Sequence, residues 1–394
     1  MDSRTGFPVV GMVGGGQLAR MTHQAAVALG QSLAVLAAAP DDPAALVSPD
    51  VRIGPHTDLA ALRAFAAHCD VLTFDHEHVP TGHLRALVAE GVTVHPGPDA
   101  LVHAQDKLVM RTRLAGLGVP VPEFAAVTAV ADAVKFGDEH GWPCVLKAAR
   151  GGYDGRGVWL LADPEEAAER VAGLLDAGTP LLVERRVAMR RELAALVARS
   201  PFGQGACWPP VQTVQADGIC VEVLAPAPGL SAEVAAQAQE LALGVAAALD
   251  VVGVLAVELF DTEAGLLVNE LAMRPHNSGH WTIEGARTSQ FEQHLRAVLD
   301  YPLGATDVLA PAVVMANVLG APAAPARSVD ERLHHVLARF PDARVHLYGK
   351  RELPGRKIGH VTLLGERPDG LRDRARLAAH WLSHGEWLDG YDIH

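Results

Sequence analysis

The sequence predicts an α/β protein with more than one domain, and three observations support that prediction. Its 394 residues exceed what one ordinary hydrophobic core takes. Strand-like and helix-like segments alternate through residues 1–100, which is typical of a parallel sheet with helices on both faces. Farther along, strand-like segments are joined by short turns, which indicates antiparallel pairing in the later part of the chain.

Residues 1–100 are expected to form an N-terminal α/β domain. A buried-strand pattern at Phe7–Val13 leads through three glycines into a helix predicted at Gln17–Leu29. Asp58 is a good N-cap residue for a second helix that ends near His68. Further strands are predicted at 32–36 and 71–74, a third helix at 81–90, and an extended segment at 92–94.

Residues 101–188 are expected to hold a linking helix and a central subdomain. The helix is predicted over 99–117, and Pro120 and Pro122 prevent its continuation. Asp163, followed by a proline and two acids, marks the start of another helix. Strands are predicted at 145–147, 158–161 and 181–184.

Residues 189–320 are expected to form a second subdomain, and residues 321–394 a small β-rich C-terminal unit. The subdomain has a predicted helix at Ser231–Leu249 and a hairpin that pairs Gly253–Phe260 with Leu266–Glu270. An alanine- and proline-rich segment at 321–326 is interpreted as a linker. The tail has strand patterns at 344–348 and 357–362.

The composition excludes several classes of protein. A formal net charge of −13 argues against nucleic-acid binding, because phosphate backbones require a basic face. No stretch approaches the roughly 18 uninterrupted apolar residues of a membrane helix, and no secretory leader pattern opens the chain. The four cysteines include no CxxC pair, which favours buried, reduced thiols over a zinc site. We therefore expect a cytoplasmic protein without a membrane partner.

A glycine-rich turn follows the first predicted strand. Gly14–Ala19 fits the G-x-G-x-x-A pattern of dinucleotide-binding turns, but Asp41 and Asp42 come late for the acid that binds the ribose. A sugar phosphate would use the same helix N-terminus, and a turn that serves only the fold also fits the pattern. These interpretations stay open at this point.

A second glycine-rich segment, Gly151–Gly157, lies between two predicted strands. Its four glycines allow a flap whose N–H groups fold over phosphates, and Lys147 on the preceding strand can direct its ammonium at the same phosphates. No Gly-Lys-Ser/Thr sequence follows, so this is not a Walker A loop. The alternative interpretation is an ordinary glycine-rich hairpin.

The predicted hairpin carries two acids near the ends of its strands. Glu258 lies on the first strand, and Asn269 and Glu270 lie on the second. Two carboxylates and an amide that face one point suit Mg²⁺, which prefers oxygen ligands and retains phosphate oxygens and water. The alternative is a solvated pair of edge carboxylates.

The loop behind the hairpin concentrates polar side chains. Arg274–Trp281 contains one cation, two histidines, an amide and a hydroxyl, which is unusual for a passive connection. His276 and His280 have the spacing of a zinc pair on a helix, but Pro275 and Gly279 argue against a helix there. We interpret the segment as a binding or catalytic loop.

Cations beside glycine turns occur near the end of this acidic chain. Lys350 follows one glycine, and Arg356 and Lys357 follow another. Arginine and lysine in such turns suit a phosphate monoester. The alternative is ordinary solvated surface charge.

Taken in order, these segments resemble the ATP-grasp superfamily, and within it the 5-(carboxyamino)imidazole ribonucleotide synthase family of bacterial purine synthesis. The resemblance extends from Gly14 to about His360 and is most specific in its third phrase. The phrases are GGGQLAR at 14–20, GGYDGRG at 151–157, NELAMRPHNSGHWT at 269–282 and GRKIGH at 355–360.

The resemblance implies a fold and an activity. The fold is an N-terminal pre-ATP-grasp domain, a two-part ATP-grasp core and a C-terminal unit. ATP would phosphorylate bicarbonate to carboxyphosphate, and the exocyclic amine of 5-aminoimidazole ribonucleotide would be carboxylated, with release of ADP and phosphate. The implied cofactors are ATP and Mg²⁺, which Mn²⁺ could replace. The implied partners are a second copy of the chain and a downstream mutase that receives the product by transient hand-over.

The resemblance also implies roles for individual residues. The expected ATP contacts are Lys107, Lys147, Gly152, Tyr153, Asp154, Gly155, Arg156, Gly157, Val158, Glu184, Arg185, Arg186, Val187, Glu192, Gln215, Asn269 and Glu270. The expected substrate contacts are Gly16, Gln17, Leu18, Glu77, Tyr153, Arg274, His276, Asn277, Ser278, Lys350, Arg356 and Lys357. The expected catalytic residues are Asp154, Arg274, His276 and Lys350, and the expected metal ligands are Glu258 and Glu270.

The chain departs from the family pattern in places, and other functions stay open. Gln215 stands where relatives often carry a nucleotide-contacting histidine, and Lys107 where they often carry an arginine. In the acidic patch after the early strand, only Glu77 matches the pattern. The alternatives are a formate-dependent glycinamide ribonucleotide transformylase, a dinucleotide-dependent oxidoreductase and a non-catalytic nucleotide sensor.

Overall fold

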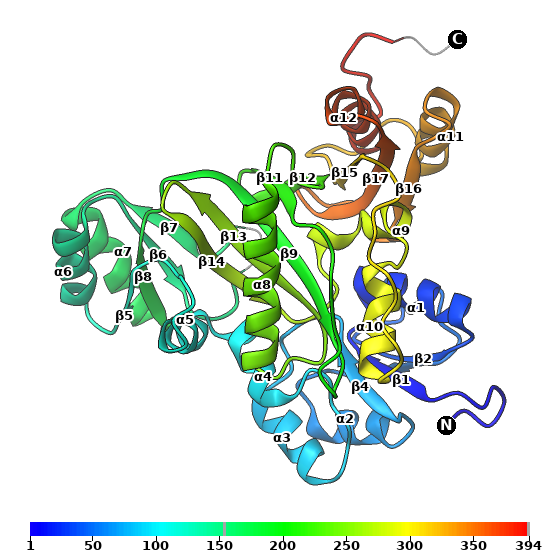
Figure 1. Ribbon diagram of the computed structural model, residues 1–394, viewed down its shortest axis with the longest axis horizontal. Helices are drawn as coiled ribbons and strands as arrows, with labels where there is room; N and C mark the ends of the chain where they lie inside the picture. Colours follow the sequence, from blue (N-terminus) through cyan, green and yellow to red (C-terminus); the bar gives the residue numbers. More distant parts are fainter. Residues whose placement is uncertain (153–154, 392–394) are drawn as a thin grey trace.

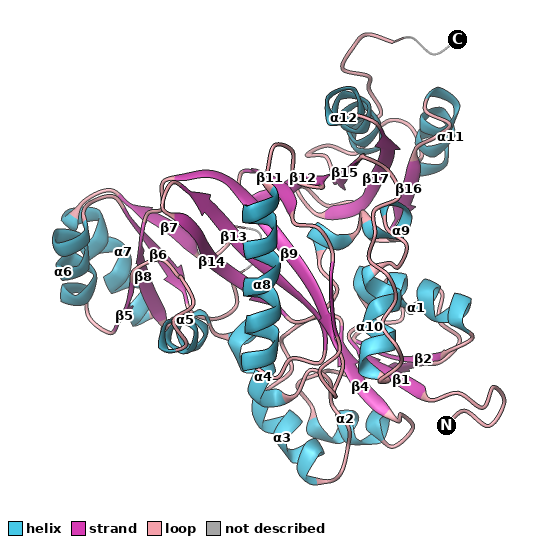
Figure 2. Ribbon diagram, in the orientation of Figure 1, coloured by secondary structure: helices cyan, strands magenta, loops and turns pink. Residues whose placement is uncertain are grey.

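The computed structural model describes residues 1–152 and 155–391, and the strands in these residues form three sheets (Figure 1). The strand orders are β3-β2-β1-β4, β5-β8-β6-β7 and β14-β13-β9-β11-β12-β15-β17-β16, with β10 paired to β9. Helices lie against all three sheets (Figure 2). The α/β fold predicted from the sequence is confirmed.

The parallel sheet belongs to the N-terminal domain. Its elements are β1 (Val9–Val13), α1 (Gln17–Leu29), β2 (Ser32–Ala37), β3 (Val51–Ile53), α2 (Leu59–Ala66), β4 (Val71–Phe74) and α3 (Thr81–Ala89). Asp58 caps α2 by accepting a hydrogen bond from the Ala60 N–H, as expected. The segment predicted to be extended at 92–94 lies beside β4. Only a single bridge joins Val94 to Leu72, since Pro96 follows closely and has no N–H to extend a ladder.

The predicted linking helix is in fact two helices, α4 (Pro98–Gln105) and α5 (Lys107–Gly116). Asp106 between them has extended backbone angles, and its carboxylate accepts hydrogen bonds from the N–H groups of Leu108 and Val109. The single helix predicted over 99–117 is therefore wrong, because the capping aspartate competes with continued helix. Lys107 consequently becomes the first residue of a helix.

The antiparallel four-stranded sheet forms a separate subdomain, which we call the lid subdomain. Its elements are β5 (Phe124–Val127), α6 (Val130–His140), β6 (Cys144–Ala148), β7 (Val158–Leu161), α7 (Pro164–Asp176) and β8 (Leu181–Arg185). Asp163 caps α7 by accepting from the Glu166 N–H, as expected. The helices pack on the sheet through a hydrophobic core of their own.

The nine-stranded sheet forms the body of the molecule. Its strands are β9 (Met189–Arg199), β10 (Gly205–Cys207), β11 (Val211–Ala216), β12 (Ile219–Ala225), β13 (Gly253–Thr262), β14 (Gly265–Ala272), β15 (Ala312–Leu319), β16 (Arg344–Leu347) and β17 (Lys357–Gly365). The accompanying helices are α8 (Ala232–Ala248), α9 (Thr282–Gly285), α10 (Gln290–Val298), α11 (Val329–Arg339) and α12 (Pro368–His384).

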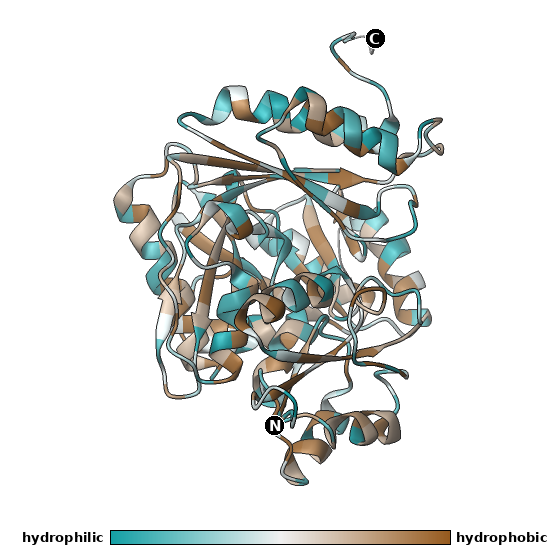
Figure 3. Cartoon of the chain, turned by 90° about the vertical axis from the view of Figure 1, so that its right-hand side faces the viewer, coloured by the Kyte–Doolittle hydropathy of each residue, from teal (hydrophilic) through white to brown (hydrophobic). Residues whose placement is uncertain are grey.

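The C-terminal strands continue this sheet. β15 pairs with β12, and β17 pairs with β15, so the boundary predicted near residue 320 falls inside one continuous set of strands. α12 packs on β15 and β17 (Figure 3). Its Arg372 and Arg376 both contact the buried carboxylate of Glu222 on β12, which ties the last helix to the body of the sheet.

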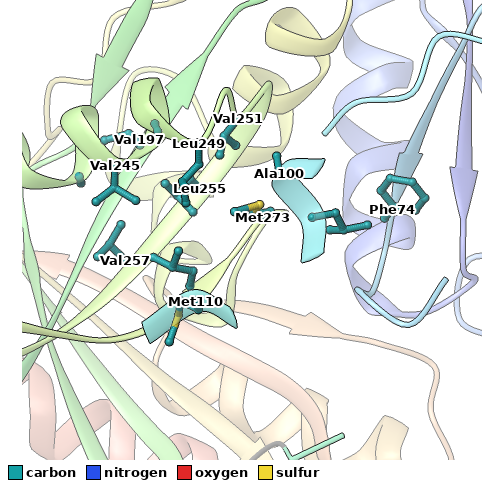
Figure 4. Packing of buried hydrophobic residues seen from close by; sticks show 14 of the residues in the cluster. Phe74, Ala100, Met110, Val197, Val245, Leu249, Val251, Leu255, Val257 and Met273 are labelled. Carbon is teal, nitrogen blue, oxygen red and sulfur yellow. The ribbon is translucent and has the colours of Figure 1, made fainter. Parts of the chain in front are cut away.

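One hydrophobic cluster joins the N-terminal domain to the nine-stranded sheet. It brings Phe74 of β4 and Ala100 of α4 together with side chains of α8, β9 and β13, including Leu255 and Val257 (Figure 4). Because this core is continuous, the end of the parallel sheet is held in a fixed position relative to the β13–β14 hairpin. In the described residues, no helix is both long enough and apolar enough to cross a membrane.

A buried histidine also fixes the N-terminal domain. His294 of α10 accepts a hydrogen bond from the Val254 N–H at Nδ1, so its Nε2–H donates to the Thr73 hydroxyl at 2.7 Å. The ring is fully buried, and burial lowers the pKa of His294 to about 3. The neutral imidazole thus connects β4 with β13.

We predict that this histidine makes the fold sensitive to acid. Since the unfolded chain binds a proton near pH 6.5 and the folded chain does not, His294 should lower the unfolding free energy by about 2 kcal/mol between pH 7 and pH 5. Urea titrations at several pH values test this. His294→Gln should flatten the pH dependence, with the exposed His68→Gln as control. An unchanged slope in His294→Gln would contradict the prediction.

Candidate active site

The two acids of the predicted hairpin lie directly opposite each other. Glu258 of β13 and Glu270 of β14 are register partners in an antiparallel pair, so their carboxylates project from the same face of the sheet. Glu192 of β9 pairs with Phe260 and lies two positions along on that face. Burial and the nearby Glu258 raise the pKa of Glu192, while a hydrogen bond from Gln215 opposes this rise.

Two lysines from different elements converge on the same point. Lys107, the first residue of α5, places its Nζ 2.7 Å from Glu270 Oε1. Lys147 of β6 contacts Asn269 Oδ1 at 3.1 Å and Glu184 Oε2 at 2.7 Å. The lid subdomain and the hairpin therefore meet through charged groups of the kind that bind a polyphosphate.

A buried arginine, which sequence reasoning missed, holds Glu184 in place. Arg111 of α5 donates to Glu184 Oε1 at 2.6 Å and to the Val268 carbonyl at 3.0 Å. Burial lowers the pKa of Lys147, and the Glu184 carboxylate opposes that effect. The Glu184 side chain is thus committed to Arg111 and Lys147. No sequence signal marks Arg111, because its partner lies 73 residues away.

The hairpin acids fit a hard divalent cation. Burial disfavours the charged form of Glu258, but His276, Lys357 and Lys107 together lower its pKa, so the carboxylate stays anionic. In residues 1–152 and 155–391, no group of three or more His, Cys, Asp or Glu is arranged to hold a metal alone. A cation at Glu258 and Glu270 would therefore take its other ligands from phosphate and water, as Mg²⁺ does.

The glycine-rich flap lies against a turn of the large sheet. Gly155 and Gly157 have φ angles of +75° and +74°, which other residues rarely adopt. A Cβ at Gly155 would lie 3.1 Å from the Gly218 Cα, so the flap and the β11–β12 turn are in close contact. Tyr153 and Asp154, two of the expected site residues, lie outside the described residues.

The polar loop behind the hairpin faces the same acids. Arg274 Nε lies 2.8 Å from Glu77 Oε1, which brings the end of the parallel sheet to this loop. His276 Nε2 lies 3.2 Å from Glu258 Oε1, and its Nδ1 contacts the Ser278 hydroxyl at 2.8 Å. The helical zinc pair that the spacing suggested does not form. Residues Asn277–Gly279 make a short 3-10 turn, and His280 is buried away from His276 with its Nδ1 on Gln290.

The N-terminus of α1 is occupied by the chain itself. Asp75 accepts hydrogen bonds from the Gly16 N–H at 2.5 Å and the Ala19 N–H at 3.0 Å. Those N–H groups would hold the pyrophosphate in a dinucleotide-binding turn. Sequence reasoning missed this role of Asp75, although an acid at the end of the neighbouring strand was visible. Of the expected substrate contacts, Leu18 is buried in a core cluster.

The C-terminal cations approach the site from the other side. Burial raises the pKa of Asp75, and the nearby charge of Lys350 opposes this effect without cancelling it. The charge of Lys357 likewise acts to lower the pKa of Glu258. Lys350 Nζ also lies 5.8 Å from the ring centre of the buried Tyr348. Arg356 lies in an exposed turn, and its backbone carbonyl accepts a hydrogen bond from the Gly320 N–H.

The remaining expected ATP contacts lie around the end of β8. Arg185 is exposed and donates to Glu123 at 3.1 Å, while Arg186 and Val187 follow it in a segment without regular structure. Lys147 contacts Asn269 of the hairpin, and Figure 1 shows the lid sheet and the large sheet next to each other. The individual roles stay predictions.

Three family models match the chain in order. The Ribonucleotide synthetase preATP-grasp domain matches residues 8–105, and the ATP-grasp domain matches residues 112–291. The Phosphoribosylaminoimidazole carboxylase C-terminal domain matches residues 313–374. The order of these matches agrees with the order of structural units described above.

Full-length relatives are also similar. N5-carboxyaminoimidazole ribonucleotide synthase of Mycobacterium tuberculosis is 66% identical over 388 residues, which cover 98% of this chain and 90% of the relative. The crystal structure of carboxyaminoimidazole ribonucleotide synthase from Aspergillus clavatus with ATP has a TM-score of 0.87 and 34% identity, covering 95% of this chain and 98% of that one. A structure from the same organism, in complex with ADP and 5-aminoimidazole ribonucleotide, has a TM-score of 0.87, 33% identity and the same coverage.

Proposed function

The chain belongs to the N5-carboxyaminoimidazole ribonucleotide synthase family, and from this membership we propose how its own residues perform the reaction. It is an ATP-dependent carboxylating ligase of purine biosynthesis. ATP phosphorylates bicarbonate, and the resulting carboxyphosphate breaks down to carbon dioxide and phosphate. The exocyclic amine of 5-aminoimidazole ribonucleotide then attacks the carbon and loses a proton, which gives the carbamate.

The observation that carries this proposal is the pairing of Glu258 with Glu270 between two lysines and the His276 loop. Lys107 and Lys147 bind the phosphates of ATP, and the glycine flap covers them. Glu258 and Glu270 would hold Mg²⁺, or Mn²⁺ in its place, and the bound cation would supply charge neutralisation for the transferring phosphoryl group. Closure of the flap excludes water, which would otherwise hydrolyse carboxyphosphate.

The polar loop handles the second half of the reaction. Arg274, held by Glu77, orients bicarbonate or the imidazole, and Asn277 and Ser278 contact the ring. His276 accepts the proton that the amine loses, and Glu258, 3.2 Å from its Nε2, stabilises the imidazolium that forms. Asp154 is an alternative proton acceptor from the flap. Lys350, Arg356 and Lys357 bind the phosphate of the ribonucleotide.

The geometry disfavours the oxidoreductase alternative. Asp75 already takes the N–H groups that a dinucleotide pyrophosphate would need, and a carboxylate there repels an anion. Gly16 and Gln17 at this turn are instead proposed to border the ribonucleotide. The chain is further proposed to act in the cytoplasm as a homodimer and to pass its product to a mutase.

A coupled ADP assay tests the proposed function. We expect ADP to form only when ATP, Mg²⁺, bicarbonate and 5-aminoimidazole ribonucleotide are all present, because carboxyphosphate is consumed productively only beside the amine. Leaving out each component in turn is the control. Turnover that requires formate and glycinamide ribonucleotide would favour the transformylase, and quenching of nicotinamide fluorescence would favour the oxidoreductase. Nucleotide binding without ADP under any mixture would indicate a sensor.

A further inference from the structure

Gln290, the first residue of α10, holds the backbone of His276 on both sides. The His276 N–H donates to Gln290 Oε1 at 2.8 Å, and Gln290 Nε2 donates to the His276 carbonyl at 2.8 Å. Because a backbone N–H can only donate, the first bond fixes which end of the amide is oxygen. The second hydrogen of Nε2 then reaches His280 Nδ1 at 3.0 Å.

This arrangement imitates a strand partner. His276 has the extended backbone angles φ −125° and ψ 153°, and the planar amide supplies the donor and acceptor that a neighbouring strand would supply. The Gln290 side chain is fully buried, so its hydrogen bonds do not compete with water. The Gln290 N–H is itself held by Thr282 Oγ1 at 2.9 Å, which closes the connection to the loop.

The helix that carries Gln290 is anchored to the N-terminal domain. His294 lies one helical turn farther along α10, and it bonds to Thr73 of β4 and to Val254 of β13. Thr73 is two residues from Asp75, which caps α1. α10 therefore connects the His276 loop to the end of the parallel sheet through two buried side chains.

We infer that Gln290 is a positioning residue for the carboxylation step, which keeps the His276 ring on Glu258. The inference rests on the proposed function, because it concerns the residue that receives the proton of the amine. In the described contacts Gln290 does not touch the hairpin carboxylates, and its side chain reaches this site through the backbone of His276. Without it the loop would keep its polar side chains but lose the alignment that proton transfer requires.

The same helix offers a matched control. Gln293 is also fully buried, and its side chain makes the same pair of bonds to the backbone of Gly304, at 2.8 Å each. Gln290→Met and Gln293→Met thus remove the same pair of backbone hydrogen bonds from equivalent depths, and Gln290→Met also removes the bond to His280. Only the first removes them from the catalytic loop, so the difference between the two variants separates positioning from stability.

The experiment compares both variants with the wild type by thermal unfolding, steady-state kinetics and pH profiles. Both should unfold at similarly reduced temperatures. Gln290→Met should lower kcat by about 10- to 100-fold, with KM for ATP unchanged and the pH profile of kcat displaced. Gln293→Met should keep the wild-type kcat and profile. Gln290→Glu retains the acceptor for the His276 N–H, so its kcat should lie between those of the wild type and Gln290→Met. It replaces Gln290→Met in the comparison if that variant does not fold.

A second measurement does not depend on catalysis. The ring ¹⁵N–¹H signals of His276, assigned by their loss in His276→Gln, should change their chemical shifts in Gln290→Met and not in Gln293→Met. Equal kinetics and equal His276 spectra in the two methionine variants would overturn the inference. A changed His276 spectrum in a protein that carboxylates nothing would support the positioning role and refute the proposed reaction instead.

Discussion

Glu270→Ala should lower kcat for ADP formation by about 100-fold or more, because a metal carboxylate contributes several kcal/mol and each ~1.4 kcal/mol is tenfold. Glu270 faces Glu258 across the hairpin and holds the ammonium of Lys107 at 2.7 Å. Its loss would remove one of the two proposed ligands for the cation and would leave Lys107 without the carboxylate that it contacts. Circular dichroism should show an intact fold, since the side chain is only half-buried.

Glu263→Ala is the matched control for this variant. It makes the same chemical change in the exposed turn of the same hairpin, away from the paired acids. Titrating Mg²⁺ at saturating ATP distinguishes the two roles of Glu270. Losing a metal ligand raises the Mg²⁺ concentration that activity requires, whereas losing only the partner of Lys107 does not. Wild-type activity in Glu270→Ala at low Mg²⁺ would refute the metal assignment.

Arg111→Met should lower the free energy of unfolding by about 3–5 kcal/mol, which is the usual effect of removing one partner from a buried ion pair. The Arg111 and Glu184 side chains are both almost fully buried, and the arginine also satisfies the Val268 carbonyl. The variant leaves Glu184 with Lys147 as its remaining charged partner. Urea unfolding monitored by tryptophan fluorescence measures the change.

Arg113→Met on the same helix is the control, since its side chain is exposed and should change stability by less than about 1 kcal/mol. Adding Glu184→Gln to Arg111→Met should lower the stability further, because the buried Lys147 ammonium then loses the carboxylate that it contacts at 2.7 Å. A double variant as stable as Arg111→Met would show that the contact between Lys147 and Glu184 does not contribute.

The parts of the site that the sequence predicted depend on local geometry. The short turn placed Glu258 and Glu270 on paired strands, but the turn alone would set Glu258 opposite Asn269. A β-bulge between Glu258 and Leu259 shifts the register so that Glu258 lies opposite Glu270. Capping positions such as Asp58 and Asp163 were likewise visible, because an N-cap acts within three residues. The same local rule was overlooked at Asp106, where it divides the predicted linking helix.

The parts that the sequence did not reveal are long-range contacts between buried polar side chains. Asp75 caps a helix that begins 59 residues earlier, and Arg111 meets Glu184 across 73 residues. In the sequence nothing distinguishes Gln290 from other residues that begin a helix, and its hydrogen bonds to the His276 backbone are visible only in the structure. Such contacts leave no periodicity in the chain, because their partners are chosen by the packing of whole elements.

The continuous hydrogen bonding from β12 through β15 to β17 has a consequence for biosynthesis of the molecule. While the ribosome is still adding residues beyond 311, β12 has β11 on one side, but its other edge presents unpaired N–H and C=O groups. The growing chain can therefore aggregate with other nascent chains through this edge until β15 has been synthesised. Shortening the protein at its C-terminus would make that exposure permanent.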